Sequence, residues 1–164
     1  MTLAELNGAG RDQFVAAIGW VFEHSPWVAE RAWDQRPFAS FEALHSSMVA
    51  IVDAAGEPAQ LALLRAHPDL GARAKMSEAS VGEQAGAGLD SLTPQEFERL
   101  HALNGDYRAR FGFPFLFAVK GASKHEVVAA LERRRFAARD EELAEAQRQV
   151  ARIARFRLED IIRA

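Results

Sequence analysis

The spacing of apolar and polar positions predicts helices along almost the whole chain. Between residues 94 and 112, apolar side chains recur every three or four positions, which is the period of one face of an α-helix. A second apolar stripe of this kind runs along residues 140–163, and Arg157 interrupts it. Only residues 113–119, "FPFLFAV", have the pattern of an extended segment or a buried loop, and one extended segment cannot form a sheet. We therefore expect an all-α fold of about eight helices with no sheet.

Short polar signals mark where several of these helices begin and end. Thr93, followed by Pro94 and by Glu96 three positions on, has the pattern of a capping box. The serines expected to cap three further helices are Ser25, Ser40 and Ser123. The glycines expected to follow the last residue of two helices are Gly56 and Gly112. Residues 71–92 are rich in glycine, and we expect irregular backbone there.

Length and composition favour one compact globular domain. A chain of 164 residues can bury about 70% of the surface that it exposes when unfolded, so we expect a single domain over residues 1–164. The hydrophobic content of 49% and the charged content of 26% are ordinary for a soluble protein. The net charge is −3 and both signs are mixed along the chain, which offers no basic stripe for a nucleic acid.

Several locations and chemistries are disfavoured by what the sequence lacks. The absence of cysteine excludes disulfides, thiolate catalysis and cysteine-ligated metals. The first residues lack the apolar stretch of a secretory signal, and no apolar run reaches the roughly 18 residues of a membrane span. The last residues, "IIRA", are not a peroxisomal signal. A cytoplasmic protein without membrane contact is therefore expected.

The stretch "RAHPDLGAR", residues 65–73, interrupts the helical pattern with groups that suit proton transfer. Pro68 disfavours helical backbone in the residue before it, so the preceding helix should stop at His67. An imidazole gains and loses protons near neutral pH, which suits an acid or base catalyst. A histidine beside a proline at a helix end is nevertheless more often structural. Asp69 can either orient this imidazole or cap the turn before Gly71, and both roles stay open.

A second polar group follows in "SVGEQAGAGL", residues 80–89. In a helix, Ser80, Glu83 and Gln84 project from one face because they are three and four positions apart. The same S-x-x-E spacing is also the ordinary capping box, with Ser80 as the cap. The two interpretations are compatible, since a helix N-terminus also presents free N–H groups to an anion.

No motif in the sequence identifies a metal, nucleophile or phosphate site. The other histidines form no H-x-x-x-H or H-E-x-x-H pair, and His67 with Asp69 and the distant Glu83 is too loose a set to predict zinc. The chain also lacks a G-x-S-x-G elbow, a P-loop and a G-x-G-x-x-G motif. We therefore expect no bound metal.

Two further features fit chemistry on an anion. The phenylalanines between residues 111 and 117 are more often core than binding wall, but a dry wall beside a histidine and a carboxylate would suit removal of a carboxylate. Solvent exposure stays open for Arg152, Arg155 and Arg157 alike, but Arg157 alone lies on the apolar side of its predicted helix. Arg157 is thus the best candidate to pair with an anion.

Taken together, these pieces resemble the 2-oxo-4-hydroxy-4-carboxy-5-ureidoimidazoline (OHCU) decarboxylases of urate degradation. The resemblance covers nearly the whole chain, with its motifs in the family's order and at similar spacing. The segments that carry it are "FEHSPWVAERAW" (22–33), "HPDLGAR" (67–73), "SVGEQAGAGL" (80–89), "LNGDYRARFGFPFLFAV" (103–119) and "RIARFRLEDII" (152–162).

The resemblance implies an all-helical enzyme of purine metabolism that needs no cofactor and converts OHCU to (S)-allantoin and carbon dioxide. It assigns His67 as the catalytic acid or base and Glu83 as its partner carboxylate. The residues that it assigns to substrate binding are Pro68, Ser80, Gln84, Phe115, Leu116, Phe117, Ala118, Val119 and Arg157. The implied partner is a small-molecule substrate, and the family's habit suggests a homodimer.

Without the resemblance, the residues leave two other classes of protein open. A metal-dependent hydrolase or cyclase would use His67, Asp69 and Glu83, and chelator treatment would separate it from a metal-free decarboxylase. A non-catalytic helical binding module would need an exposed apolar groove for its partner.

Overall fold

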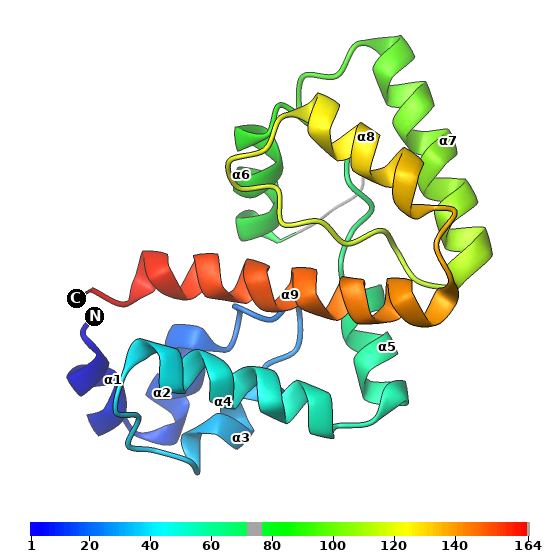
Figure 1. The fold of residues 1–164 in the computed structure, drawn as a ribbon. Coiled ribbons are helices and arrows are strands. Elements are labelled where there is room, and N and C mark those ends of the chain that lie inside the picture. Colours follow the sequence, from blue (N-terminus) through cyan, green and yellow to red (C-terminus); the bar gives the residue numbers. More distant parts are fainter. Residues whose placement is uncertain (72–76, 164) are drawn as a thin grey trace. The chain divides into compact units, whose positions relative to one another are not determined.

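The structure is a computed structural model that describes residues 1–71 and 77–163. These residues form nine α-helices and no β-strand, so the predicted all-α fold is confirmed (Figure 1). The helices are α1 (Leu3–Gly8), α2 (Arg11–Ile18), α3 (Trp27–Trp33), α4 (Phe41–Ala54), α5 (Glu57–Arg65), α6 (Glu78–Gly86), α7 (Pro94–Phe111), α8 (Lys124–Arg134) and α9 (Arg139–Ile161). Within residues 1–71 and 77–163, no single helix is long and apolar enough to cross a membrane. Only α4 and α5 together, bent by 114°, have the necessary length and composition.

The chain divides into two compact units. The first consists of Met1–Ala66 together with Val150–Ala164, and the second consists of His67–Gln149. Helix α9 begins in the second unit and ends in the first.

The predicted caps account for several of the helix ends. The hydroxyl of Thr93 accepts a hydrogen bond from the N–H of Glu96, whose carboxylate accepts one from the N–H of Thr93, and this confirms the capping box of α7. Ser40 and Ser123 cap α4 and α8 through the same kind of bond to the N–H three residues on. Gly112 follows α7 with a φ of 79°, a left-handed conformation that glycine adopts without strain.

Two expectations about local structure need correction, and two helices were not predicted. Ser25 is not a cap: α3 begins at Trp27, and the Ser25 hydroxyl donates to the carbonyl oxygen of Glu23 at 2.8 Å. Helix α6 occupies residues 78–86 of the stretch 71–92, where irregular backbone was expected. Residues 87–92 are irregular as expected, and residues 72–76 lie outside the described part of the chain. Helices α1 and α2 also escaped the prediction, because six and eight residues are too few to show a clear apolar period.

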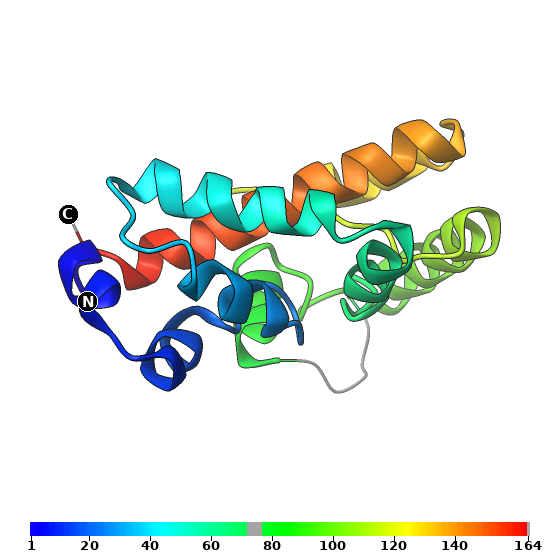
Figure 2. The same cartoon turned by 90° about the horizontal axis from the view of Figure 1, so that it is seen from below.

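The first unit buries its core between short helices, with α3 packed against α2 and α4. Phe14, Ile18 and Leu44 are fully buried there. Figures 1 and 2 both show α4 beside the C-terminal part of α9, and Nε2 of His45 lies 2.8 Å from the carbonyl oxygen of Ala151. The two ends of the chain also meet in this unit, because the N–H of Arg163 donates to the carbonyl oxygen of Met1 at 2.8 Å.

The second unit packs α7 against α8 around a cluster of aromatic side chains. The Tyr107 ring lies 4.5 Å from that of Phe111 and 5.4 Å from that of Phe115, measured between ring centroids. Residues 113–119 form neither helix nor strand, and all of them except the half-buried Phe117 are buried. The predicted buried loop is therefore confirmed.

Candidate active site

His67 is the first residue after the end of α5 and its C-cap, Ala66. Its side chain is buried, with the residue 7% exposed. The helix ends just before this residue, close to where it was predicted to stop, because Pro68 disfavours helical backbone in the residue that precedes it. Pro68 itself is half-buried. A buried imidazole at the start of a loop is compatible with both a structural and a catalytic role.

The loop that follows His67 is held by three bonds from the helices of its own unit. Oδ1 of Asp69 accepts a hydrogen bond from Nη2 of Arg108 at 2.6 Å. The carbonyl oxygen of Leu70 accepts one from Nδ2 of Asn104 at 2.9 Å. These two bonds come from adjacent positions on one face of α7, so that helix fixes the path of the loop. Of the two roles left open for Asp69, the structure shows neither and gives it an arginine partner instead.

The third bond joins the loop to α6. The N–H of Gly71 donates to Oε1 of Gln84 at 2.8 Å, in a buried position. The amide of Gln84 is thereby brought to the segment that begins with His67. The carbonyl oxygen of the Gln84 side chain thus binds the backbone of the loop directly.

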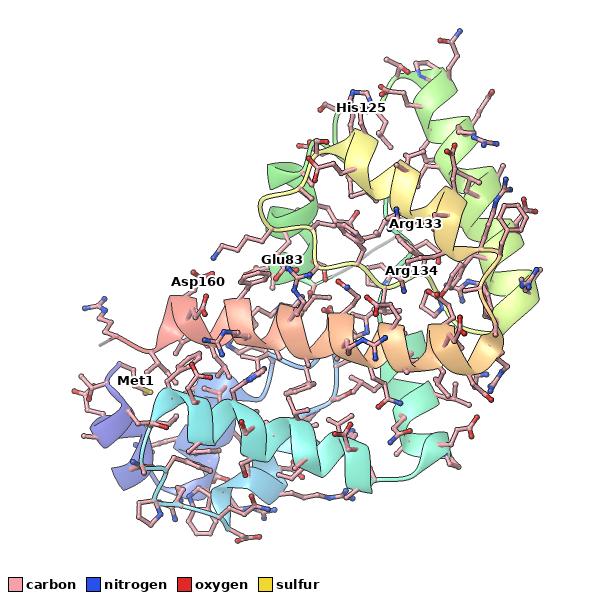
Figure 3. The ribbon with its side chains drawn as sticks, viewed as in Figure 1. Met1, Glu83, His125, Arg133, Arg134 and Asp160 are labelled. Carbon is pink, nitrogen blue, oxygen red and sulfur yellow. The ribbon has the colours of Figure 1, made fainter. Side chains whose placement is uncertain are left out.

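Helix α6 arranges Ser80, Glu83 and Gln84 as the helical alternative required. Its N-cap is Ser77, whose hydroxyl accepts from the N–H of Ser80 at 3.2 Å, so the interpretation of Ser80 as the cap is wrong. Ser80 and Gln84 are buried, and Glu83, which is labelled in Figure 3, is half-buried. Their spacing of three and four positions places them on one face of the helix. The three side chains therefore form one polar strip along α6, and two of them are shielded from solvent.

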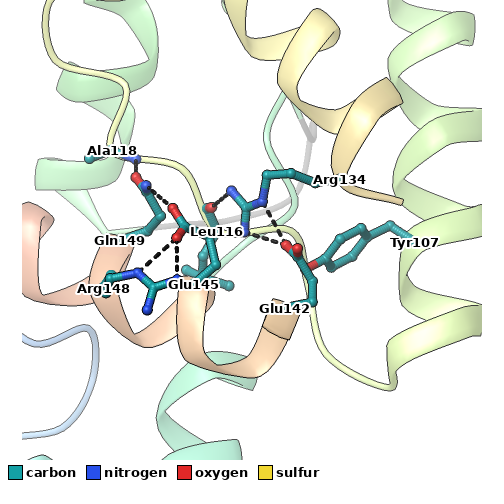
Figure 4. Close-up of polar contacts among 8 residues, drawn as sticks. All are labelled: Tyr107, Leu116, Ala118, Arg134, Glu142, Glu145, Arg148 and Gln149. Atoms are coloured by element: carbon teal, nitrogen blue, oxygen red, sulfur yellow. Dashed lines mark hydrogen bonds and ion pairs between the residues drawn. The ribbon is translucent and has the colours of Figure 1, made fainter. Parts of the chain in front are cut away.

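The loop of residues 115–119, which the resemblance assigned to substrate binding, is held by side chains of α8 and α9 (Figure 4). Nη1 of Arg134 donates to the carbonyl oxygen of Leu116 at 2.7 Å. Oε1 of Gln149 accepts from the N–H of Ala118 at 2.9 Å. A loop without regular secondary structure satisfies its buried backbone groups in this way.

Arg134 belongs to a buried ionic cluster. Its Nε donates to Oε1 of Glu142 at 2.6 Å, and the hydroxyl of Tyr107 donates to the same oxygen at 2.5 Å. Burial, and then the hydrogen bond to Glu142, raises the pKa of the Tyr107 hydroxyl above its usual range, because a phenolate there would be poorly solvated beside a carboxylate. Tyr107 therefore stays a neutral donor.

Arg157 belongs to the first unit, where it forms a buried ion pair. Its Nη2 lies 2.9 Å from Oε2 of Glu23, and the two side chains are only 3% and 1% exposed. Its Nη1 donates to the carbonyl oxygens of Trp20 and Val21 at 3.3 and 3.4 Å. The predicted burial of this arginine is thus found, and its carboxylate partner is a residue that the sequence analysis did not select.

Four more residues with ordered polar contacts escaped the sequence analysis, although a signal was present. Asn104 lies on the apolar face of α7, and Glu142 and Gln149 lie on the buried face of α9. Arg134 follows Leu131 by three positions on the buried face of α8. A polar residue within an apolar stripe was the signal that selected Arg157, and applied to every helix it would have found these as well.

The residues named for a metal-dependent hydrolase do not form a ligand group in the described part of the chain. No set of three histidine, aspartate or glutamate side chains there is close enough to hold a metal ion. Asp69, one of the three residues named, is paired with Arg108.

Comparison with known proteins identifies the family. A family model described as OHCU decarboxylase matches residues 7–159. The OHCU decarboxylase of Halalkalicoccus jeotgali is 45% identical over 161 residues, which cover 98% of this chain and 92% of that protein. The one from Haloferax volcanii is 48% identical over 158 residues, which cover 96% and 94%. The crystal structure of an (S)-allantoin synthase matches with a TM-score of 0.81 at 34% identity, over 99% of this chain and 54% of that chain.

The chain therefore belongs to the OHCU decarboxylase family. The family predicted from the motifs of the sequence is confirmed.

Proposed function

We propose that this protein is a decarboxylase that converts OHCU to (S)-allantoin and carbon dioxide in urate degradation. The observation that carries the proposal is the close similarity, over more than nine-tenths of both chains, to relatives that bear the name of this activity. The buried polar strip of α6 and the loop that begins at His67 supply groups suited to it.

The reaction needs one proton and a place for one electron pair. The bond between the ring carbon and the carboxylate breaks, and carbon dioxide leaves without the bonding electrons. The pair passes to the neighbouring carbon–nitrogen double bond, giving an enol-like intermediate. A proton must then reach one face of the carbon that carries the ureido group, because that carbon becomes the stereocentre. We assign this proton to His67 as general acid, with Glu83 as the carboxylate that orients the imidazole or binds the ureido N–H groups.

The remaining predicted residues would hold the substrate and its developing charge. Ser80 and the NH₂ group of Gln84 are donors fixed on one helix face, and donors that are already oriented stabilise charge without further reorganisation. The apolar loop of residues 115–119, together with Pro68, would desolvate the carboxylate and so favour the neutral product. Arg157 would pair with an anionic or carbonyl oxygen of the substrate.

The other expectations belong to the same proposal. The family match spans residues 7–159, which supports residues 1–164 acting as one OHCU decarboxylase-like domain. We also propose that the enzyme works in the cytoplasm without a metal or other cofactor, on a small-molecule substrate and as a homodimer. Activity after chelator treatment tests the cofactor, and light scattering on a sizing column tests the dimer.

Enantioselective product formation is the test of the activity. The substrate is unstable, so urate and the two preceding enzymes of the pathway generate it in place, and circular dichroism then follows allantoin. The unaided reaction gives racemic product. We expect the protein to speed the appearance of one enantiomer, and His67→Ala to lower turnover by about 10²–10⁴-fold, the usual contribution of general acid–base catalysis.

The matched control is His125→Ala, which removes an exposed histidine on α8 (Figure 3) and should keep the full rate. Racemic product at the unaided rate with the wild-type protein would overturn the proposed activity. Near-native rates from folded His67→Ala and Glu83→Ala would leave the activity standing and overturn the assignment of these two residues.

A further inference from the structure

Residues 115–119 form a loop of the proposed substrate site. This loop has no regular secondary structure, so side chains from other elements must fix its conformation. It has no helical or strand hydrogen bonds, and it runs without a bend from Pro114 to Val119. The ring of Phe115 stacks on that of Phe117 at 6.0 Å with an interplanar angle of 20°. Side chains two positions apart share a side in an extended chain, so this stacking indicates that the loop is extended.

Two side chains bind the backbone of this loop at alternate residues (Figure 4). Arg134 donates to the carbonyl oxygen of Leu116, and Gln149 accepts from the N–H of Ala118. In an extended chain, the backbone groups of residues two apart point the same way, and those of the residue between them point the opposite way. The N–H and carbonyl of Phe117 are therefore turned away from both side chains. Among the described residues, no intramolecular hydrogen bond engages either group.

Both binding side chains are themselves held in place. The guanidinium of Arg134 is paired with Glu142 and lies 4.5 Å from the centre of the Phe115 ring. The side chains of Arg134 and Glu142 are only 10% and 2% exposed, which places their bonds in surroundings of low dielectric constant where they are strong. Nε2 of Gln149 donates to Oε1 of Glu145 at 2.8 Å, and this fixes the amide so that its oxygen faces Ala118.

We infer that Arg134 and Gln149 are positioning residues of the enzyme. This inference rests on the proposed function, and it adds two residues that touch the loop rather than the reacting atoms. By engaging Leu116 and Ala118, they hold the loop in the one register that presents the N–H and carbonyl of Phe117 on its other side. A ureido-substituted ring offers both N–H donors and carbonyl acceptors, which such a pair of backbone groups can bind.

The test compares Gln149→Met with the exchanged pair Glu145→Gln/Gln149→Glu. Methionine keeps the approximate shape of the side chain but cannot accept the bond from Ala118. In the exchanged pair, the new amide at 145 donates to the new carboxylate at 149, which still accepts from Ala118. Arg148→Met is the control, because Arg148 is exposed and binds Glu145 without touching the loop.

The readout is KM against kcat for OHCU generated from urate, with the melting temperature followed by circular dichroism. We expect Gln149→Met to raise KM about fivefold to tenfold, the effect of one hydrogen bond on binding, and the exchanged pair and the control to keep KM near the wild-type value. A purely structural role would lower the active fraction, and hence the apparent kcat, while KM stayed the same.

An unchanged KM for folded Gln149→Met beside an active wild type overturns the inference and leaves the proposed function intact. An inactive wild type overturns both. If Gln149→Met does not fold, Arg134→Lys takes its place, because lysine can keep a charge for Glu142 but lacks the second arm that reaches Leu116. A raised KM in that variant supports the inference, and a wild-type KM overturns it.

Discussion

The guanidinium of Arg157 donates to the carboxylate of Glu23 at 2.9 Å, and both side chains are almost completely buried. Glu23 precedes His24, whose φ of 45° is in the left-handed region that few residues other than glycine adopt. The pair joins the segment before α3 to the last turns of α9, within the first unit. The orientation of the arginine that we assign to substrate binding therefore depends on a carboxylate 134 residues away in the sequence.

Removing this carboxylate should be strongly destabilising. In Glu23→Ala, the guanidinium of Arg157 stays buried without its counter-charge, and breaking a buried ion pair from one side typically lowers the free energy of unfolding by about 3–5 kcal/mol. Urea unfolding followed by circular dichroism measures the change. The control is Glu159→Gln, since Glu159 is exposed on α9 and pairs with Arg155 at the surface. Its urea midpoint should stay almost unchanged, and equal losses in the two variants would show that the burial of the first pair contributes nothing.

The backbone angle at position 71 and the neighbouring side chains both favour glycine there. The φ of Gly71 is 73°, and a Cβ atom added to it would lie 2.5 Å from Cδ2 of Leu100, which is buried. We expect Gly71→Ala to lower the free energy of unfolding by about 1–3 kcal/mol, as overpacking and a strained φ usually do. The variant should also lose activity, because a backbone shift that relieves the clash would move the N–H that binds Gln84.

Gly105 provides the opposite case for comparison. It lies in the interior of α7, and a Cβ atom there would have no neighbour within 4 Å. Gly105→Ala should raise the free energy of unfolding by up to about 1 kcal/mol, the difference in helix propensity between the two residues. The same urea titrations check both glycines. Similar effects of the two substitutions would mean that neither the φ of Gly71 nor the proximity of Leu100 matters.

The parts of the fold that the sequence predicts are those set by neighbours a few residues apart. Thr93 and Glu96 are three positions apart, so their reciprocal bonds depend on little besides local conformation. The end of α5 before Pro68 and the end of α7 at Gly112 are equally local. Ser25 shows that such local predictions can fail. Its hydroxyl donates to the carbonyl oxygen two residues earlier instead of accepting from an N–H group of α3.

The sequence predicts which residues belong to the candidate site, but it does not predict which residues they contact. The spacing of Ser80 and Gln84 correctly indicated one face of a helix, and the position of Pro68 indicated that the helix ends just before His67. The partner of Asp69 lies 39 residues away on α7. Pairing over such distances is decided by how helices pack, which a single sequence does not specify, and the same is true of Glu23.

The capping box of α7 should make stability depend on pH in the acid range. The hydrogen bond from Lys124, followed by the one from the N–H of Thr93, lowers the pKa of the Glu96 carboxyl to about 2, well below its usual value of 4.5. The folded protein therefore binds this proton less readily than the unfolded chain. The stabilisation is complete above about pH 4.5 and is lost as the pH falls toward 2.

Urea midpoints of the wild type and of Glu96→Gln, taken from pH 7 down to pH 2, measure this contribution. The wild type should be the more stable of the two at pH 7, and the difference should shrink below about pH 4.5. Glu98→Gln makes the same change of charge at an exposed position of the same helix and is the matched control. A difference between wild type and Glu96→Gln that stays constant over the whole range would contradict the link to this carboxyl.

The last prediction separates two roles of Asp69. If Asp69 oriented the imidazole of His67, Asp69→Asn would remove a catalytic interaction and lower kcat/KM by about 10²-fold or more. The structure instead joins Asp69 to Arg108, in a partly exposed pair whose contribution is small. We therefore expect Asp69→Asn and Arg108→Met each to lower kcat/KM by less than about tenfold, through a less ordered loop. The double variant should be no worse than either single one, because both remove the same bond. Additive losses, or a much larger loss in Asp69→Asn than in Arg108→Met, would indicate that Asp69 has a catalytic role beyond its bond to Arg108.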